Sequence, residues 1–166
     1  MEIQSIIHTY KDNIFKTCLG FTGNVEEAND LVQEVCINLW RDLDSFQQNA
    51  QISTWIYRVT VNTCLMHKRK KRLEVVPLKT ATSPIAVQTE QKVTNESDLL
   101  LLRKFIADLP EKERVLMLLY LENLSYDEMA SITGLTSNYI GVKINRIKKS
   151  LTKKFNQHGR VTCNME

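Results

Sequence analysis

Residues 125–150 read SYDEMASITGLTSNYIGVKINRIKKS, and this stretch decides the fold of the C-terminal part of the chain. Ser125 and Glu128 have the spacing of a capping box, which predicts the start of a helix. Gly134 can adopt the left-handed conformation that ends such a helix. The apolar periodicity then resumes and predicts a last helix at about 137–156. Two helices joined by so short a turn predict a helix–turn–helix, whose second helix can enter the major groove of DNA.

The last predicted helix has a buried side and an outward side. Thr136 or Ser137 is its expected N-cap, and Ile140 and Ile144 are expected to pack on the preceding helix near the small Ala130. Asparagine and arginine can read base edges through paired hydrogen bonds, and lysine binds phosphates. The residues expected at DNA are Asn138, Tyr139, Lys143, Asn145, Arg146, Lys148 and Lys149. A helix–turn–helix can also serve packing alone, but the basic residues that follow this one favour DNA.

Helical periodicity also dominates the rest of the chain. Apolar residues at spacings of three and four predict helices at about 3–20, 25–43, 52–72, 96–108 and 111–122. Asn24 and Glu27 have the spacing of a second capping box. The pattern is lost in the segment that contains Pro77 and Pro84, which indicates a linker. The predicted fold is all-α, with two small helical domains at 1–72 and 96–157, a flexible linker at 73–95 and a tail at 158–166.

Basic residues are strongly segregated along the chain. Residues 45–73 and 129–165 contain thirteen of the 22 lysines and arginines and none of the 19 aspartates and glutamates. The formal net charge of +3 therefore hides two cationic blocks separated by acidic sequence. Blocks of one sign set the long-range electrostatic field, so we expect a polyanion as partner. The alternative, two solvated helix faces, leaves the lack of acids in both blocks unexplained.

The predicted helix at 25–43 has two stripes on opposite sides. The apolar stripe is expected in the core and contains Leu31, Val32, Val35, Cys36, Leu39 and Leu43. The opposite, mostly polar stripe contains Asp30, Gln33, Glu34, Ile37 and Arg41. One interpretation of this stripe is an ordinary solvated face. An isoleucine in the middle of an acidic patch instead favours a protein partner with basic side chains.

The predicted helix at 52–72 combines aromatic and basic residues. Its expected core side contains Ile52, Trp55, Ile56, Val59, Thr63 and Met66. The residues expected on other sides are Tyr57, Arg58, Val61, Asn62, Leu65 and Arg69. Aromatic rings can stack with unstacked bases while cations hold the backbone, so the pattern suits single-stranded or melting DNA. For Trp55, the alternative is a structural role in the core.

No motif in the sequence is typical of an enzyme or of a metal site. The chain lacks GxSxG, HExxH and a phosphate-binding glycine loop. Cys64 and His67 form a C-x-x-H, with Cys36 and His8 as distant candidate ligands, but scattered thiols are more often small buried hydrophobes. We therefore expect no catalytic residue, no metal and no cofactor.

The sequence also lacks a membrane or export signal. No apolar run approaches the roughly 20 residues that span a bilayer. The first residues, MEIQSIIHTYKDN, do not have the basic-then-apolar order of a secretory signal. Scattered cysteines without a CxxC pair fit a reducing compartment. We expect a cytoplasmic protein without membrane insertion.

Two long motifs resemble those of a known family. Residues 30–62 contain DLVQEV, LW, the aromatic residue Phe46, STWIYRV and then Asn62. Residues 109–151 contain LP, LSYDEMA, a glycine at the turn and RIKKSL. In this order and with a linker between them, they resemble the two domains of bacterial extracytoplasmic-function (ECF) sigma factors. The resemblance covers nearly the whole chain.

The resemblance implies a role for each part. The family docks on core RNA polymerase at positions that correspond here to Asp30, Gln33 and Glu34, and we expect Ile37 and Arg41 of the same stripe to take part. It reads and melts the minus-ten element at positions that correspond to Phe46, Trp55, Tyr57, Arg58, Asn62, Lys68 and Arg69. Its second domain reads the minus-thirty-five duplex with the helix–turn–helix. The polymerase performs the chemistry, and members are commonly restrained by an anti-sigma factor.

The chain departs from the family pattern at two places. Met66 and His67 stand where many members have an acidic residue, and residues 138–142 replace the usual start of the recognition helix. Within this segment, Gly141 costs about 1 kcal/mol relative to alanine in a helix. A close approach to DNA is one explanation for this glycine.

Two other functions compete with the sigma-factor hypothesis. The first is a stand-alone transcriptional regulator that uses only the helix–turn–helix. It leaves the polar stripe at 30–41 and the acid-free block at 45–73 without a role. The second is an antagonist or adaptor that binds polymerase without promoter-specific initiation, and transcription from a matching promoter distinguishes it from a sigma factor.

Overall fold

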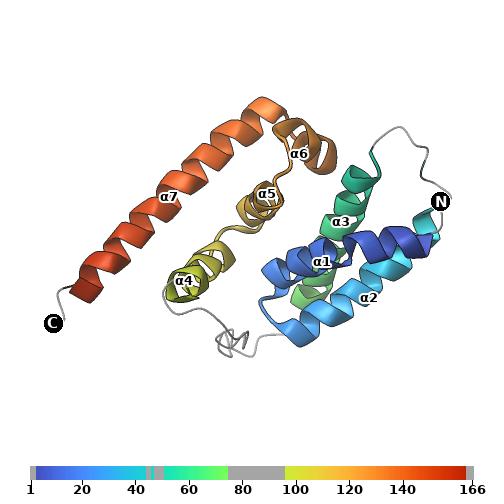
Figure 1. Cartoon of the computed structure of the whole chain (residues 1–166), viewed down its shortest axis with the longest axis horizontal. Coiled ribbons are helices and arrows are strands. Elements are labelled where there is room, and N and C mark those ends of the chain that lie inside the picture. The colour runs from blue at the N-terminus through green and yellow to red at the C-terminus, as the bar shows by residue number, and fades with distance from the viewer. Residues whose placement is uncertain (1–2, 44–45, 47–50, 75–95, 164–166) are drawn as a thin grey trace. The chain divides into compact units, whose positions relative to one another are not determined.

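The computed structural model describes residues 3–43, 46, 51–74 and 96–163, with side chains at 4–43, 46, 51–71 and 98–157. The chain divides into two compact units, Met1–Thr89 and Glu90–Glu166. The first contains α1 (Ile3–Thr22), α2 (Val25–Asp42) and α3 (Ile52–Glu74). The second contains α4 (Glu96–Ala107), α5 (Glu111–Leu121), α6 (Tyr126–Thr133) and α7 (Ser137–Cys163) (Figure 1). The prediction of two all-α domains is confirmed.

Helices α1, α2 and α3 pack against one another around one apolar core (Figure 1). The apolar stripe predicted for α2 supplies its centre, because Leu31, Val35 and Leu39 are at most 1% exposed. Val32, Cys36 and Leu43 of the same stripe are half-buried at its edge. The stripe on the opposite side of α2 is therefore left at the surface.

The predicted capping box at the start of α2 is only half formed. The Asn24 side chain accepts a hydrogen bond from the Glu27 backbone N–H at 3.1 Å, as an N-cap should. The Glu27 carboxylate does not complete the box but contacts α3, where Lys71 lies 2.6 Å from its Oε1 atom. An ion pair to a neighbouring helix thus takes the place of the local hydrogen bond.

The buried side of α3 differs from the predicted one. Met66, expected in the core, is 67% exposed, whereas Tyr57 and Val61 are 5% and 4% exposed. The reason is that Thr54, Thr60 and Thr63 fill part of the buried side, at no more than 4% exposure, so the apolar residues of α3 do not mark that side by themselves. Tyr57 accepts a hydrogen bond from Asn13 of α1 at 3.1 Å, and Thr63 accepts one from Asn38 of α2 at 3.0 Å.

The end of α3 also lies later than expected. The helix continues to Glu74, so residues 73 and 74 are helical although they were assigned to the linker. The rest of the predicted linker, 75–95, lies outside the described residues.

In the second unit, α4, α5 and α6 each contact α7 (Figure 1). A buried cluster joins α4, α5 and α7 through Ile106, Leu109, Met117, Ile147 and Leu151. The Arg114 guanidinium of α5 donates hydrogen bonds to the carbonyl oxygens of Ala107 and Leu109, which closes the turn after α4. Partial burial lowers the pKa of Arg114 from its ordinary value.

The helix–turn–helix forms as the sequence predicts. Both hydrogen bonds of the Ser125–Glu128 capping box are present, and Gly134 ends α6 with a φ of 73°. Thr136, the first of the two expected caps, accepts a hydrogen bond from the Tyr139 backbone N–H at 3.3 Å. The other candidate, Ser137, instead donates to the Asp127 carboxylate.

Helix α7 is anchored by the predicted isoleucines and is longer than predicted. Ile140 and Ile144 are fully buried. The helix continues to Cys163, so most of the predicted tail at 158–166 is helical, and 164–166 lie outside the described residues.

Gly141 lies against another helix within the fold. A Cβ atom at this position would lie 3.2 Å from Cε2 of Tyr126, a tighter contact than most side chains make. Tyr126 is the first residue of α6, and its ring packs over α7 at the glycine. Helix–helix packing is therefore a second explanation for Gly141, beside the expected close approach to DNA.

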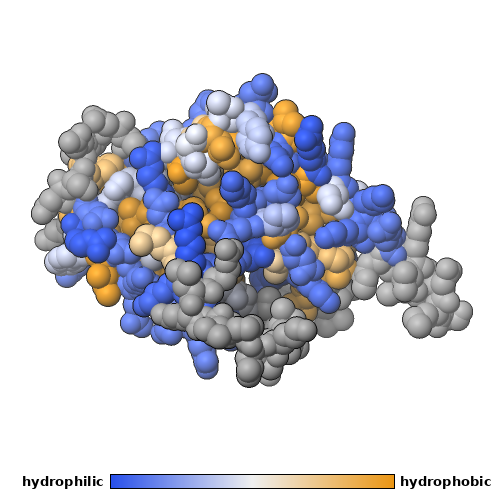
Figure 2. Space-filling view, turned by 180° about the vertical axis from the view of Figure 1, so that it is seen from behind, coloured by the Kyte–Doolittle hydropathy of each residue, from blue (hydrophilic) through white to orange (hydrophobic). Residues whose placement is uncertain are grey.

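The molecular surface is mainly hydrophilic on the side shown in Figure 2, with hydrophobic residues exposed between the polar ones. The large apolar residues exposed in the first unit include Ile37, Trp40 and Met66. Among the described residues, no helix has the length and apolar composition needed to cross a membrane.

Candidate polymerase and DNA interfaces

The outward side of α2 presents all five residues of the predicted polar stripe. Asp30, Gln33, Glu34 and Arg41 are exposed, and Ile37 is 66% exposed. We call these five residues the α2 face. The Arg41 guanidinium donates to the Asp42 carboxylate at 2.9 Å, and this hydrogen bond raises the pKa of Arg41.

Trp40 was not among the predicted site residues, although its indole ring is 60% exposed beside the α2 face. Its position three residues after Ile37 places it on the outward half of the helix. A signal was therefore present in the sequence. Large exposed aromatic side chains are common where proteins bind partners.

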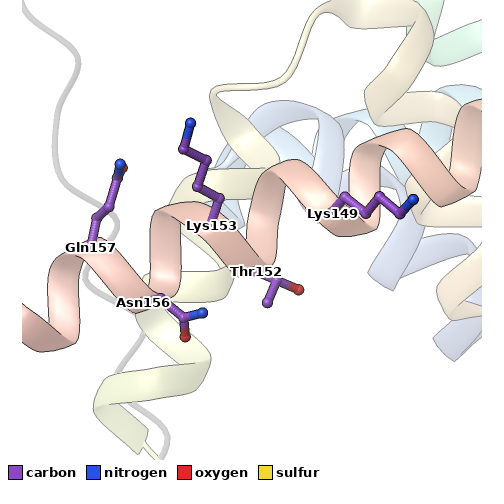
Figure 3. A pocket seen from close by; sticks show the side chains of 5 residues that line it. All are labelled: Lys149, Thr152, Lys153, Asn156 and Gln157. Carbon is purple, nitrogen blue, oxygen red and sulfur yellow. The ribbon is translucent and has the colours of Figure 1, made fainter.

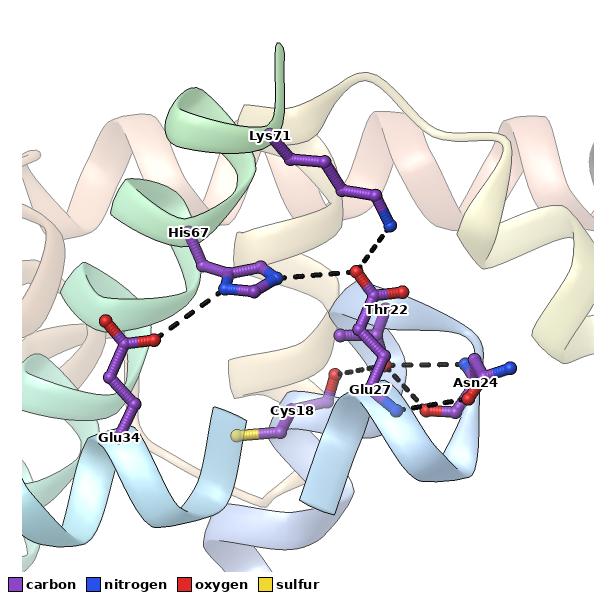
Figure 4. Close-up of polar contacts among 7 residues, drawn as sticks. All are labelled: Cys18, Thr22, Asn24, Glu27, Glu34, His67 and Lys71. Carbon is purple, nitrogen blue, oxygen red and sulfur yellow. Dashed lines mark hydrogen bonds and ion pairs between the residues drawn. The ribbon is translucent and has the colours of Figure 1, made fainter. Parts of the chain in front are cut away.

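A polar seam joins α2 to α3 along one edge of the α2 face (Figure 4). His67 lies between two carboxylates, with Nε2 3.4 Å from Glu27 and Nδ1 3.7 Å from Glu34. Burial tends to raise the pKa of Glu27, but hydrogen bonds from Lys71 and His67 outweigh this effect and lower it. Further along, Asn38 donates to Thr63 at 3.0 Å. The seam fixes the position of Glu34 relative to α3.

Phe46 and Trp55 form an aromatic pair near the N-terminal end of α3. Their ring centroids lie 5.1 Å apart, with the ring planes tilted by 40°. Both residues are half-buried, so Trp55 is neither a fully buried core residue nor a free one. Residues 47–50, between them in sequence, lie outside the described residues. The pair is a solvent-accessible aromatic surface on which a base can stack.

A basic stripe continues along α3 from this pair. Arg58, Asn62, Leu65 and Arg69 follow one another at spacings of four, three and four, which places them on one side of the helix. The three polar residues are exposed and Leu65 is half-buried. We call these four residues the α3 face. Of the other predicted minus-ten residues, Lys68 is half-buried beside it.

Tyr57 does not lie on this surface. The structure places it in the core of the first unit, at 5% exposure, with its hydroxyl bonded to Asn13. We therefore leave Tyr57 out of the candidate DNA interface.

The basic residues of α7 divide into two groups. Lys143 pairs with Glu113 at 3.2 Å, and Lys148 lies 3.1 Å from the Tyr120 hydroxyl and 5.1 Å from its ring centroid. These two predicted DNA residues are therefore also engaged within their own unit. The outward residues are Asn138, Asn145, Arg146 and Lys149, which are exposed, together with Tyr139 at 48% exposure. We call these five residues the α7 face.

The α7 face continues into a polar groove along the same helix (Figure 3). This groove has a volume of about 390 Å³ and is lined by Lys149, Thr152, Lys153, Asn156 and Gln157. All five side chains project from one helix, so the groove is an open surface feature and not an enclosed ligand site. No acidic residue lies among them, which suits contact with phosphates.

The C-x-x-H motif does not assemble into a metal centre. Over the described residues, no group of three or more His, Cys, Asp and Glu side chains could hold a metal ion. The Cys64 thiol lies 3.9 Å from that of Cys18, and both side chains are buried. The hydrogen bond to Cys18 and burial raise the pKa of Cys64, which keeps this thiol protonated and unreactive.

Comparison with known proteins identifies both units. Residues 6–74 match sigma-70 region 2, and residues 99–151 match sigma-70 region 4. The ECF RNA polymerase sigma factor SigW of Bacillus subtilis is 30% identical over 161 residues, which cover 90% of this chain and 86% of SigW. The ECF sigma factor EcfG of Rhodopseudomonas palustris is 26% identical over 135 residues, which cover 81% of this chain and 74% of EcfG.

The fold itself occurs in a solved structure. The sigma factor RpoE from Bartonella quintana, crystallised with the anti-sigma factor NepR, superposes with a TM-score of 0.73 at 19% identity. The match covers 92% of this chain and 96% of that one.

The region 2 match covers the sequence that a stand-alone regulator would leave unused, and the region 4 match covers the helix–turn–helix. The chain belongs to the ECF RNA polymerase sigma factors, which are not enzymes but initiation factors that bind core RNA polymerase and direct it to promoters.

Proposed function

We propose that this sigma factor uses the α2 face to bind core RNA polymerase. The observation that supports this most strongly is Ile37, which is 66% exposed among acidic and polar residues. Covering an exposed aliphatic side chain removes apolar surface from water, and this favours association. The neighbouring carboxylates of Asp30 and Glu34 suit basic side chains on the polymerase.

The α3 face and the Phe46–Trp55 pair bind the minus-ten element in this proposal. The exposed guanidinium groups of Arg58 and Arg69 attract the phosphate backbone, and Lys68 adds a third cation beside them. An aromatic pair can receive a base that has left the stack, at about 1–3 kcal/mol per stacked base. Cations that bind the backbone and an aromatic pair that stacks with a base together suit promoter melting, because separated strands expose both.

The α7 face reads the minus-thirty-five element as duplex. Arg146 and the asparagines at 138 and 145 can form paired hydrogen bonds with base edges, while Lys149 and Lys153 contact phosphates. Two linked modules on one promoter raise the total affinity without tight binding by either.

An anti-sigma factor is the proposed negative regulator. The structural relative RpoE was solved with such a protein, NepR. The exposed acidic and apolar residues of the α2 face are suitable for that contact as well. Because its partner is the polymerase, the protein is proposed to act in the cytoplasm.

Transcription of a fragmented genomic library tests the proposal. Core polymerase is assayed with and without this protein, and start sites are mapped. We expect discrete new start sites that share two spaced sequence elements. DNA binding without new transcripts would instead favour the adaptor or the stand-alone regulator.

Charge reversal tests the α2 face. Asp30→Lys combined with Glu34→Lys should weaken binding to core polymerase at least tenfold, because both lysines would then face basic side chains. Asp12→Lys, an exposed reversal on α1, is the matched control. Titration of labelled polymerase gives the affinities, while binding of the minus-thirty-five duplex should stay at the wild-type level. Unchanged polymerase affinity would exclude this face.

Alanine substitution distinguishes base from phosphate contacts on the α7 face. Arg146→Ala should lose about 1–3 kcal/mol on the preferred minus-thirty-five sequence and much less on others, as expected for a bidentate base contact. Lys149→Ala should lose affinity equally on all sequences and reduce the salt dependence. Competition binding on a panel of single-base variants measures both. A uniform loss for Arg146→Ala would identify it as a phosphate contact.

A further inference from the structure

We propose that the polymerase-binding surface extends from α2 across the seam to Met66 of α3, so that Met66 and Ile37 are covered by one apolar patch of the polymerase. This inference rests on the proposed role of the α2 face. It adds an exposed residue of α3 that the sequence placed in the core.

Two polar contacts fix the register of the seam. Asn38 donates to Thr63 at 3.0 Å, and His67 Nδ1 lies 3.7 Å from the Glu34 carboxylate. Asn38 follows Glu34 by four residues, and His67 follows Thr63 by four, so each helix contributes one turn to this part of the seam. The helices run antiparallel here. Figure 4 shows the Glu34–His67 contact.

Ile37 and Met66 occupy matching positions between these two contacts. Ile37 lies between Glu34 and Asn38 in sequence, and Met66 lies between Thr63 and His67. Each is one residue away from a seam residue, so each side chain is rotated outward by about 100° from it. Ile37 is 66% exposed and Met66 is 67% exposed. Two large apolar side chains thus flank the same short length of the seam on its outer side.

The carboxylates on the α2 side of this pair favour a protein partner over DNA. The nearest outward carboxylates are those of Glu34 and, one turn earlier, Asp30, which repel phosphates. On the α3 side, Arg69 and Lys70 follow Met66 by three and four residues, so exposed cations border the pair there. The occupant that fits is a protein surface that covers the apolar pair and places basic side chains against Asp30 and Glu34, which is the chemistry proposed for the polymerase at the α2 face.

The methionine side chain suits this role. It is long and unbranched, and its polarizable thioether adapts to an irregular apolar surface. A leucine should replace it with little loss, whereas alanine or aspartate should not. Met66→Leu is therefore the conservative variant, because it keeps an apolar side chain of similar size at the proposed contact.

The experiment measures binding of the full chain to core polymerase for Met66→Ala, Met66→Asp, Met66→Leu, Ile37→Ala and the double alanine variant. We expect Met66→Ala and Ile37→Ala each to weaken binding about 3- to 10-fold, and Met66→Asp to weaken it more. Met66→Leu should bind like the wild type. The double variant should lose less than the product of the two single effects, because both side chains meet one patch.

Val25→Ala is the matched control, since Val25 is an exposed apolar residue at the start of α2, away from the seam. It should bind polymerase like the wild type. Thermal unfolding is measured for every variant and should be unchanged for Met66→Ala, because the side chain is already exposed. Met66→Asp provides an independent test of the same contact. We expect it to remain folded and to bind polymerase more weakly than the wild type.

Three results would overturn the inference. Wild-type polymerase affinity of both Met66→Ala and Met66→Asp would exclude contact, and the proposed α2 face would still stand if Asp30→Lys with Glu34→Lys weakened binding. Normal polymerase affinity with impaired open-complex formation at saturating polymerase would place Met66 at DNA. Tighter polymerase binding by Met66→Ala would mean that another part of this chain covers the patch.

Discussion

Glu27 contacts three residues, one through its backbone and two through its carboxylate. Its backbone N–H donates to Asn24, while its side chain contacts Lys71 and His67 of α3. Hydrogen bonds from these two side chains lower the pKa of Glu27 below its ordinary value although burial opposes them. A carboxyl group with a lowered pKa in the folded state stabilises the fold when it is ionised. That contribution is complete above the ordinary value, about 4.3, and disappears as the pH falls through the lower folded value.

Glu27→Gln should therefore lower the free energy of unfolding at pH 6. The difference from the wild type should shrink as the pH falls from 5 to 3. Urea unfolding at a series of pH values measures this difference. Glu26→Gln removes a carboxylate from the same exposed helix start and controls for the helix dipole. A difference that stays constant down to pH 3 would show that the ion pair to α3 does not stabilise the fold.

Single residues also show where sequence reasoning is limited. The spacing of Asn24 and Glu27 predicts a capping box, but Lys71, 44 positions later, competes for the carboxylate. Lys143 and Lys148 have the chemistry of DNA ligands, yet Glu113 and Tyr120 lie within reach of them. Such competitors are distant in sequence and become neighbours only when the helices pack.

At the scale of elements, α6 and α7 meet at Tyr126 and Gly141. Alanine at position 141 would favour the helix by about 1 kcal/mol. It would also press its Cβ against the Tyr126 ring, at 3.2 Å. The outcome depends on how far the ring can move. The two effects can be separated because only one of them needs the tyrosine.

We expect Gly141→Ala to stabilise the protein by about 1 kcal/mol in a Tyr126→Ala background and by clearly less in the wild type. Chemical unfolding of the four proteins of this double-mutant cycle gives both values. Equal gains in the two backgrounds would show that the ring moves aside without cost. Such a result would remove packing as the reason for the glycine.

The helices themselves were predictable because their apolar residues repeat at helical spacing and their caps are local. For the stripe on α2 this was sufficient, since the buried side of that helix is apolar. On α3, threonines at positions 54, 60 and 63 share the buried side with Tyr57 and Val61, while Met66 is exposed. The apolar pattern alone therefore does not identify the buried side of α3. The exposed residues of the α2 face followed directly from the pattern, and the same helical spacing also indicates the outward position of Trp40, three residues after Ile37.

At the scale of the whole molecule, the two units match two separate family regions, and each has its own buried core. A chain that ends at residue 95 should therefore fold and retain polymerase binding. It should lose recognition of the upstream promoter element, because α7 is absent. Polymerase titration and footprinting on a promoter from the genomic library measure the two properties.

The full chain with Arg146→Ala provides a comparison for this truncation, since it keeps the second unit but alters its reading of DNA. Loss of polymerase binding together with promoter recognition in the truncated chain would show that the units are not independent. The same result would assign part of the polymerase contact to the second unit.

The arrangement of α7 has a consequence for how promoter preference can change over evolutionary time. The residues that hold this helix in place, Ile140, Ile144, Ile147 and Leu151, are at most 5% exposed. Asn138, Asn145 and Arg146 project to the other side and take no part in that core. If the α7 face reads the minus-thirty-five element as proposed, substitutions among the outward residues redirect the protein to new genes while its stability stays nearly constant. A gene duplicate could acquire a separate regulon through a few such changes, and the same side of the helix is where an engineered, mutually independent set of transcription switches should be varied.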